Sequence, residues 1–291
     1  MAIAQRASIS VAALLKLGRV SNLPTVWTNV LAATVIAGGN WESWRTGVLM
    51  WTMSLFYVGG MYLNDYFDRK IDAHERPERP IPAGEISAAT VRMFGFGMLG
   101  LGVVVMAAMG VVPASTGVLL ALAIVLYDAF HKANPAAPVM MGACRALVYC
   151  SAAAVAIGSV PSTVVIAALA LLAYVAGLTY AARQESLDRV GNLWPLPQLF
   201  TPMLLALPAL GQGLLPAFVY LALIGCTAYA IYLLAARPMP GAVPSAVGLL
   251  IAGISLVDAA FLAGAGEVAP ALVATLGFPM TLLLQKYVSG T

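Results

Sequence analysis

The sequence predicts an all-α membrane protein, a polytopic bundle of nine or ten transmembrane helices that forms a single domain over residues 1–291. Of its 291 residues, 61% are hydrophobic and only 9% are charged. Soluble domains carry about 25% charged residues, so the composition alone places the chain in a bilayer. Apolar runs of about 20 residues, the length that crosses the hydrocarbon core, recur along the whole chain. No long linker or low-complexity region divides it further.

The apolar runs define ten candidate spans. Short turns such as 38–40, 110–113 and 158–161 separate some of them, and two charged loops separate others. The last four are the hardest to bound. Prolines crowd the seventh, and Pro270 and Pro279 interrupt the tenth, where each removes a backbone donor. The expected spans are 20–38, 47–65, 89–110, 113–131, 138–158, 161–182, 193–211, 214–236, 242–264 and 268–287.

Lysine and arginine predict the orientation. Nearly all of them fall on the side of this topology that holds the N-terminus, and only Arg45 lies clearly opposite. Basic residues gather in cytoplasmic loops, so the N-terminus and the charged loops are expected in the cytoplasm. Lys286 is cytoplasmic with ten spans and external with nine, and the charge bias favours ten. The net charge of +3 is too small to indicate a nucleic-acid partner.

A run of carboxylates follows the second span. Asp65, Asp68 and Asp72 stand at i, i+3 and i+7, directly after Asn64. In a helix, at about 100° per residue, they lie within roughly a 60° arc of one face. Carboxylates held together repel one another unless a cation lies between them. Mg²⁺ is the candidate, because it takes carboxylate oxygens and often bridges to phosphate.

The loop after these acids also carries cations. Residues 64–87 hold half of the chain's 12 acidic residues, and Arg69 and Lys70 stand among them. Carboxylates that hold Mg²⁺, beside guanidinium and ammonium groups that neutralise phosphate, suit a metal–diphosphate complex. The alternative is a solvated charged loop that closes two membrane helices. Gly84 is expected to form a turn, and Ser87 is expected to cap the next helix.

These residues carry a resemblance. The run N-D-x-x-D-x-x-x-D from Asn64 to Asp72, followed by R-P-x-x-x-G from Arg79 to Gly84, resembles the UbiA superfamily of intramembrane prenyltransferases. The resemblance implies a helical bundle, usually of nine spans. It also implies Mg²⁺-dependent transfer of an isoprenoid from its diphosphate to an acceptor. Asp65, Asp68 and Asp72 would then be metal ligands and catalytic residues, and Asn64, Arg69 and Lys70 would bind the diphosphate.

The family has a second acidic motif, D-x-x-x-D, after the sixth span. Asp188 fits its second aspartate, as a catalytic residue and metal ligand, but Gln184 stands where the first is expected. Two interpretations remain open. Glu185 and Asp188 supply the carboxylates of a second metal site in a shifted register, or Asp188 binds the ion weakly with an amide and water. A solvated loop is the alternative to both.

Further candidate residues lie near the cytoplasmic ends of three spans. Tyr127 and Lys132 loosely match family positions near the diphosphate. His131 either donates a hydrogen bond to the phosphate or is an ordinary interfacial histidine. Arg145, two turns into the fifth span, is costly in hydrocarbon and must face a cavity or a partner; it binds phosphate or pairs with Asp128. Asn22 contributes to the polar cavity or, like Asn29, to interhelical hydrogen bonds. For Asp258 we expect a structural hydrogen bond.

Together these features predict a Mg²⁺-dependent prenyltransferase. Its partners would be an isoprenyl diphosphate and a lipophilic, aromatic or polyol acceptor, with the prenyl tail among helices open sideways to membrane lipid. Pyrophosphate would be released. The alternative is a multi-span transporter of a small anionic or phosphorylated solute. Against the transporter, the acids cluster at a loop mouth and not at mid-membrane. The sequence gives no indication of oligomeric state.

Overall fold

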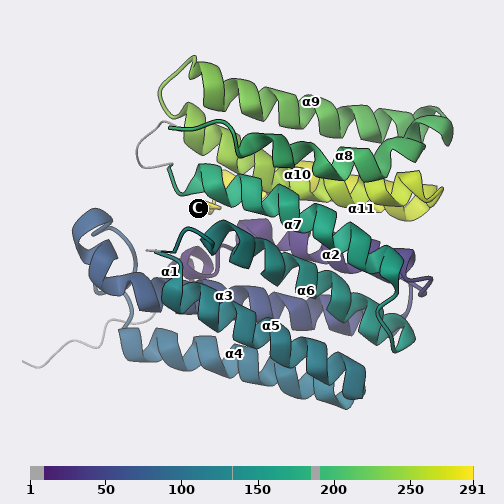
Figure 1. Cartoon of the computed structure of the whole chain (residues 1–291). Coiled ribbons are helices and arrows are strands. Elements are labelled where there is room, and N and C mark those ends of the chain that lie inside the picture. Colours follow the sequence, from purple (N-terminus) through teal and green to yellow (C-terminus); the bar gives the residue numbers. More distant parts are fainter. Residues whose placement is uncertain (1–9, 133, 185–190, 291) are drawn as a thin grey trace, which may run out of the picture.

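The protein is a bundle of long helices that lie side by side (Figure 1). In this computed structural model, the described residues are 10–132, 134–184 and 191–290, and they contain helices and connecting turns but no strand. Helices α4 and α9 lie at opposite sides of the bundle, with α2, α6 and α7 between them (Figure 1). The all-helical prediction is confirmed for this part of the chain.

The helices follow the predicted order. After a short N-terminal helix, each long helix falls on one of the apolar runs. The bounds are α1 Val11–Leu17, α2 Leu23–Ile36, α3 Trp44–Glu75, α4 Ala88–Ala108, α5 Val111–Phe130, α6 Ala137–Ile157, α7 Ser162–Ala182, α8 Thr201–Ala206, α9 Leu214–Ala236, α10 Ala242–Gly264 and α11 Val268–Gln285.

Among the described residues, fewer helices are long and apolar enough to cross a membrane than the ten apolar runs predict. Seven of the described helices are long and apolar enough to span a membrane: α4, α5, α6, α7, α9, α10 and α11. At 14 residues α2 is about 21 Å long, which is short of the roughly 30 Å hydrocarbon core. The seventh predicted span is α8 between two 3₁₀ segments, because its prolines prevent a continuous helix. The counts of nine and ten are therefore not confirmed.

Two boundaries differ from the sequence prediction. Helix α3, which is 32 residues long, does not end at residue 65 but continues to Glu75, so much of the expected loop is helical. The charged residues after 65 do not stop it, since charge does not break a helix that leaves the apolar layer. Helix α11 also runs through Pro279 without a break. The predicted cap and turn are confirmed, because Ser87 Oγ accepts from the Thr90 amide at 3.1 Å and Gly84 has φ +76°.

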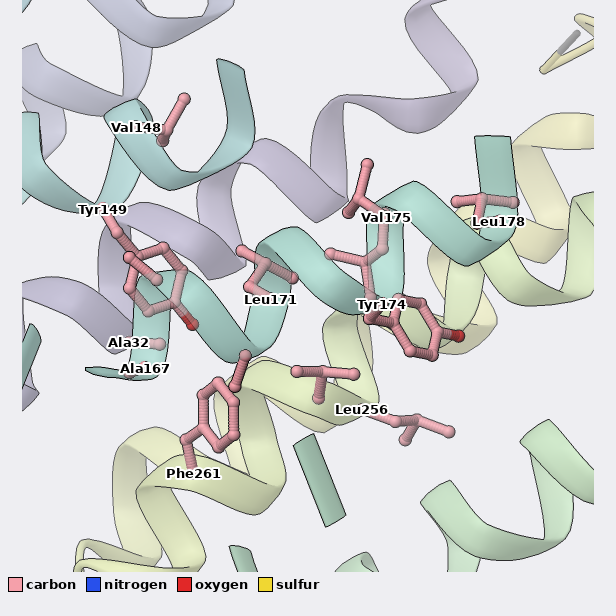
Figure 2. Packing of buried hydrophobic residues seen from close by; sticks show 14 of the residues in the cluster. Ala32, Val148, Tyr149, Ala167, Leu171, Tyr174, Val175, Leu178, Leu256 and Phe261 are labelled. Atoms are coloured by element: carbon pink, nitrogen blue, oxygen red, sulfur yellow. The ribbon is translucent and has the colours of Figure 1, made fainter. Parts of the chain in front are cut away.

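The core lies where α6, α7 and α10 meet. Figure 2 shows Tyr149, Leu171, Tyr174 and Phe261 packed into it, and the first three are fully buried. Small residues let α6 and α7 approach closely, since a Cβ on Gly142 would lie 2.6 Å from the carbonyl oxygen of Leu172. Small residues at helix contacts are typical of membrane bundles, where close van der Waals packing replaces the hydrophobic effect.

One end of the bundle gathers the charged segments. Helix α1, the charged end of α3 and the chain's C-terminal end lie together there, at the left of Figure 1. The opposite end holds short turns such as the one between α2 and α3. The two ends therefore differ in chemistry as the charge distribution of the sequence predicts.

Candidate active site

A cavity of about 720 Å³ opens within the bundle between α2, α3, α5, α6, α7 and α10. Its wall is apolar over much of its area, and polar and charged side chains gather in one part of it. The apolar lining comprises Val26, Met53, Phe56, Leu120, Ile124, Met141, Val148, Val175, Leu178, Val247, Ile251 and Ile254. A cavity of this kind suits an amphiphile with a long apolar part and a charged head.

On the acidic face of α3, Asp68 lines the polar part of the cavity, and Asp65 and Asp72 are paired with Arg79, which also lines it. Asp65, Asp68 and Asp72 are each at most 6% exposed, because the helix continues to Glu75 and turns this face inward. Arg79, from the turn after the helix, joins two of them. Its Nη1 lies 3.1 Å from Asp65 Oδ1 and 2.9 Å from Asp72 Oδ2. The predicted shared face is confirmed, and one guanidinium group neutralises part of its charge.

Arg19 approaches the same cluster from the segment between α1 and α2. Its Nη2 lies 3.2 Å from Asp65 Oδ1 and 3.4 Å from Asn64 Oδ1. The residue adopts a left-handed backbone with φ 41°, which is unusual for a side chain other than glycine. Such conformations persist where surrounding contacts hold them, and they are frequent at functional sites.

Asp68 has different partners. Its Oδ2 lies 3.4 Å from His131 Nε2 and 3.4 Å from Lys132 Nζ, both near the end of α5. Burial by itself raises the pKa of this carboxyl, but the contacts with His131 and Lys132 lower the pKa below its usual value. Tyr127 stacks on His131, with ring centroids 4.9 Å apart. Asp68 is therefore ionised at neutral pH and faces the cavity.

Asn64 links the acidic face of α3 to α5. Its Nδ2 donates to Asp128 Oδ1 at 3.3 Å, while its Oδ1 accepts from Arg19. Asp128 lines the cavity and is only 3% exposed. Its other oxygen, Oδ2, is buried and has no hydrogen-bond partner among the described residues. The expected alternative of an Asp128–Arg145 ion pair is absent from the described contacts.

Asn22 lies at the cavity wall where the start of α2 meets the C-terminal segment. Its Nδ2 donates to the Tyr57 hydroxyl at 3.2 Å and to the Gly290 carbonyl at 2.8 Å. Its Oδ1 accepts from Gln285 Nε2 at 3.2 Å. The residue therefore lines the cavity, as predicted, and also makes the interhelical hydrogen bonds that were the alternative.

Arg145 lines another part of the cavity. Its Nη1 donates to Asn29 Oδ1 at 2.9 Å and its Nη2 donates to Thr25 Oγ1 at 3.0 Å. The amide of Asn29 then donates to both carboxylate oxygens of Asp258, at 3.0 and 2.8 Å. Asp258 is fully buried and also accepts a hydrogen bond from the Tyr149 hydroxyl. The expectation of a structural hydrogen bond for Asp258 is confirmed.

Four predicted site residues are absent from the cavity wall: Asp65, Arg69, Lys70 and Asp72. Arg69 donates to the carbonyl of Tyr66 at 2.6 Å and lies 4.4 Å from that ring's centroid. Lys70 is exposed. Because both follow Asp68 on a continuing helix, they point to other faces of it. Glu185 and Asp188 lie outside the described residues. Gln184 Oε1 accepts a hydrogen bond from the Gly191 amide at 2.8 Å.

The structure adds residues that were not assigned to the site from sequence. Arg19 and Arg79 hold Asp65 and Asp72, and Asp128 faces the same cavity. Arg79 begins the R-P-x-x-x-G run, so its place in that motif was the available signal. Arg19 begins the run 19–22, which resembles the family's N-terminal pattern. Its contact with Asp65 and that of Asp128 with Asn64 gave no local signal, because they join residues 46 and 64 positions apart.

The donor set fits Mg²⁺ in chemistry. Within residues 10–132, 134–184 and 191–290, no three Asp, Glu, His or Cys side chains are grouped closely enough to hold a metal ion. The acids of α3 nevertheless present hard oxygen donors beside basic side chains, which is the combination that binds a magnesium–diphosphate pair. A cation bound by Asp65 and Asp72 would replace part of the ion pairing with Arg79.

Comparison with known proteins identifies the fold and the family. The profile of the UbiA prenyltransferase family matches residues 25–256. Similar relatives are digeranylgeranylglyceryl phosphate synthases from Methanopyrus kandleri, 36% identical over 93 residues, and from Methanothrix thermoacetophila, 30% identical over 125 residues. These alignments cover 31% and 43% of this chain, and only 33% and 47% of the relatives.

Solved structures match over more of the chain. A structure from a study of digeranylgeranylglyceryl phosphate synthase in membranes has a TM-score of 0.60, with 21% identity, 88% of this chain and 98% of that chain covered. A UbiA homologue from Archaeoglobus fulgidus bound to GPP and Mg²⁺ has a TM-score of 0.59, with 16% identity and coverage of 86% and 99%. At these identities the likeness shows a shared fold.

Proposed function

Because this chain is an integral membrane protein that belongs to the UbiA prenyltransferase family, we propose that it transfers an isoprenyl group within the membrane. The donor is an isoprenyl diphosphate, the acceptor is a lipophilic, aromatic or polyol molecule, and pyrophosphate is released. One observation carries the proposal. Asp68, from the acidic face of α3, and the basic side chains beside it line the polar part of a cavity whose wall is otherwise largely apolar, which matches the two halves of a prenyl diphosphate.

The diphosphate would occupy the polar part of the cavity. Basic side chains there include Arg19, Arg79, His131 and Lys132, which come from the segment between α1 and α2, the turn after α3 and the end of α5. Asn64, Tyr127 and Asn22 add neutral donors. Arg69 and Lys70 remain predicted phosphate contacts, and they would reach the diphosphate only through a change of side-chain direction. The prenyl chain would extend along the apolar wall.

Mg²⁺ would be held by Asp65, Asp68 and Asp72, with Asp188 and Glu185 as candidates for a second ion, and it would neutralise charge on the diphosphate. The chain's own residues then have three tasks. Arg19, Arg79 and Lys132 stabilise the departing diphosphate. The apolar wall keeps water from the allylic carbon once its bond to oxygen breaks. The cavity holds the acceptor so that its oxygen or carbon attacks that carbon and loses a proton.

The names of similar proteins support this reaction class. The relatives are synthases of digeranylgeranylglyceryl phosphate, and one structural neighbour binds GPP with Mg²⁺. The family assignment also argues against the transporter that the number of spans left open.

We further propose that the end of the bundle with the acid cluster faces the cytoplasm, with the N-terminus. The excess of Lys and Arg at this end supports it. The exposed His74, replaced by cysteine, should react with an impermeant maleimide from the cytoplasmic side only. Glu42→Cys, in the turn before α3, should react from the opposite side only. The reverse pattern at both positions would invert the topology.

The central test is pyrophosphate release by purified protein in detergent. Geranyl, farnesyl and geranylgeranyl diphosphates would be supplied with and without Mg²⁺, and a cell-extract metabolite pool would supply the acceptor. We expect Mg²⁺-dependent release together with a new prenylated mass. Folded protein that releases no pyrophosphate from any donor would contradict the proposed function.

A further inference from the structure

Arg145 is a half-buried cation on α6, and we assign it a role other than the phosphate contact that the sequence left open. It stands two turns into α6, in the apolar layer, where a charged side chain is costly and usually marks a substrate path. Its guanidinium lies 5.6 Å from the ring centroid of Tyr57. Tyr57 precedes Asp65 by eight residues on α3, which corresponds to about 12 Å along the helix. The Arg145 guanidinium, beside Tyr57, therefore lies deeper in the bundle than the acids of α3.

The contacts of Arg145 fix its position but leave donors free. Arginine carries five N–H groups in a planar fork. Two of them bind Asn29 and Thr25, and the residue forms no salt bridge among the described residues. Because the fork also borders the cavity, its remaining N–H groups are available to a ligand there.

The side of Arg145 away from the cavity is built to hold the guanidinium. The Asn29 amide donates to Asp258, so its oxygen must point towards Arg145. Asp258 in turn is fixed by the hydroxyl of Tyr149. Asn29 and Asp258 thus act as positioning residues, and they orient the charge of Arg145 without taking up its fork.

We propose, on the basis of the function proposed above, that Arg145 binds an anionic group on the acceptor, either a carboxylate or a phosphate monoester. A planar guanidinium matches both groups, because it donates two parallel hydrogen bonds. The donor diphosphate and the acceptor anion then occupy separate parts of one cavity. Since like charges repel, the position of Arg145 deeper in the bundle than Asp68 lets both substrates bind together.

Matched acceptor pairs test the proposal. Binding would be measured calorimetrically in detergent, with Mg²⁺ and the unreactive donor farnesyl thiodiphosphate present. One pair is geranylgeranylglyceryl phosphate and its dephosphorylated alcohol, and the other is 4-hydroxybenzoate and 4-hydroxybenzamide. The first pair tests a phosphate and the second a carboxylate. We expect the anionic member of one pair to bind about tenfold more tightly, the usual size of a charge-assisted contact.

In Arg145→Gln this preference should fall to about one, while the affinity for farnesyl thiodiphosphate stays within about twofold. The matched control Arg45→Gln, at the opposite end of the bundle, should retain the preference. Arg145→Lys keeps the charge without the planar fork, so its preference for the anionic acceptor should fall several-fold. It replaces Arg145→Gln as the test if the glutamine variant does not fold. A lysine variant with the full preference would overturn the proposal.

Two other results would also overturn it. One is a wild-type protein that does not distinguish either pair. The other is an Arg145→Gln variant that keeps the preference for the anionic acceptor but loses affinity for the donor. That result would make Arg145 a residue that binds the diphosphate. Failure of the wild-type protein to bind the donor with Mg²⁺ is a different outcome, because it would contradict the proposed function itself.

Discussion

Two groups of buried carboxylates in this protein are stabilised in different ways. At the mouth of the cavity, Asp65, Asp68 and Asp72 are paired with long basic side chains. Deeper in the bundle, Asp258 is held by the short neutral donors of Asn29 and Tyr149. Long cationic side chains at a partly open mouth can exchange partners, whereas short donors in a packed core cannot. The first group suits ligand exchange and the second suits fixed structure.

The largest expected effect is at the mouth. Asp68→Asn keeps the shape of the side chain but removes a carboxylate that is ionised at neutral pH. We expect turnover to fall about 10²–10³-fold, the usual effect of removing one electrostatic contact to a transition state. The measurement is Mg²⁺-dependent pyrophosphate release, with Glu42→Gln at the opposite end as the control. Wild-type turnover in folded Asp68→Asn would contradict a catalytic role for the acid cluster.

The second effect concerns stability in the core. Asp258→Ala removes the acceptor of three hydrogen bonds and leaves the Asn29 amide and the Tyr149 hydroxyl unpaired. We expect a loss of about 3 kcal/mol, the lower end for breaking a buried charged network. Thermal unfolding in detergent, compared with Asp68→Asn, would measure it. A smaller loss at Asp258 than at Asp68 would reverse the contrast between fixed core and exchangeable mouth.

A smaller effect is expected at Arg79. Arg79→Gln removes the cation that joins Asp65 and Asp72, and half-buried Arg79 leaves little cavity when shortened. We expect the KM for the prenyl diphosphate to rise about tenfold, as for the loss of one charge-assisted contact, and the unfolding temperature to fall, because buried Asp72 loses its cation. Steady-state kinetics over a range of donor concentrations would show it. A drop in unfolding temperature without a change in KM would make Arg79 structural.

The smallest expected effect is a difference in Mg²⁺ dependence between variants of Asp188 and Gln184, in the second acidic motif. Gln184 binds the Gly191 amide, whereas Asp188 is a predicted metal ligand. We expect Asp188→Asn to raise the Mg²⁺ concentration needed for half-maximal turnover several-fold, and Gln184→Ala to change it less, since metal ligands typically cost more than a loop contact. Mg²⁺ titrations of both variants make the comparison. Equal tolerance of both substitutions would show that this loop holds no metal.

The sequence alone predicted the helices and much of the acidic site. The period of α3 placed Asp65, Asp68 and Asp72 on one face, and the apolar runs located every long helix, since both are local properties. Family membership followed from the same run of residues. The prediction that the charged segment after residue 65 forms a loop was wrong, because local charge does not show whether a helix continues beyond the apolar layer.

The tertiary structure decided the partners. Arg19 meets Asp65 across 46 residues, and Asn29 meets Asp258 across 229 residues. Because α2 packs against α6 and α10, the partner of Arg145 is Asn29 and not Asp128. No local pattern encodes such pairs, because they depend on how the helices are arranged and rotated in the bundle. The sequence therefore determined which residues are chemically able to act, and packing determined which of them act together.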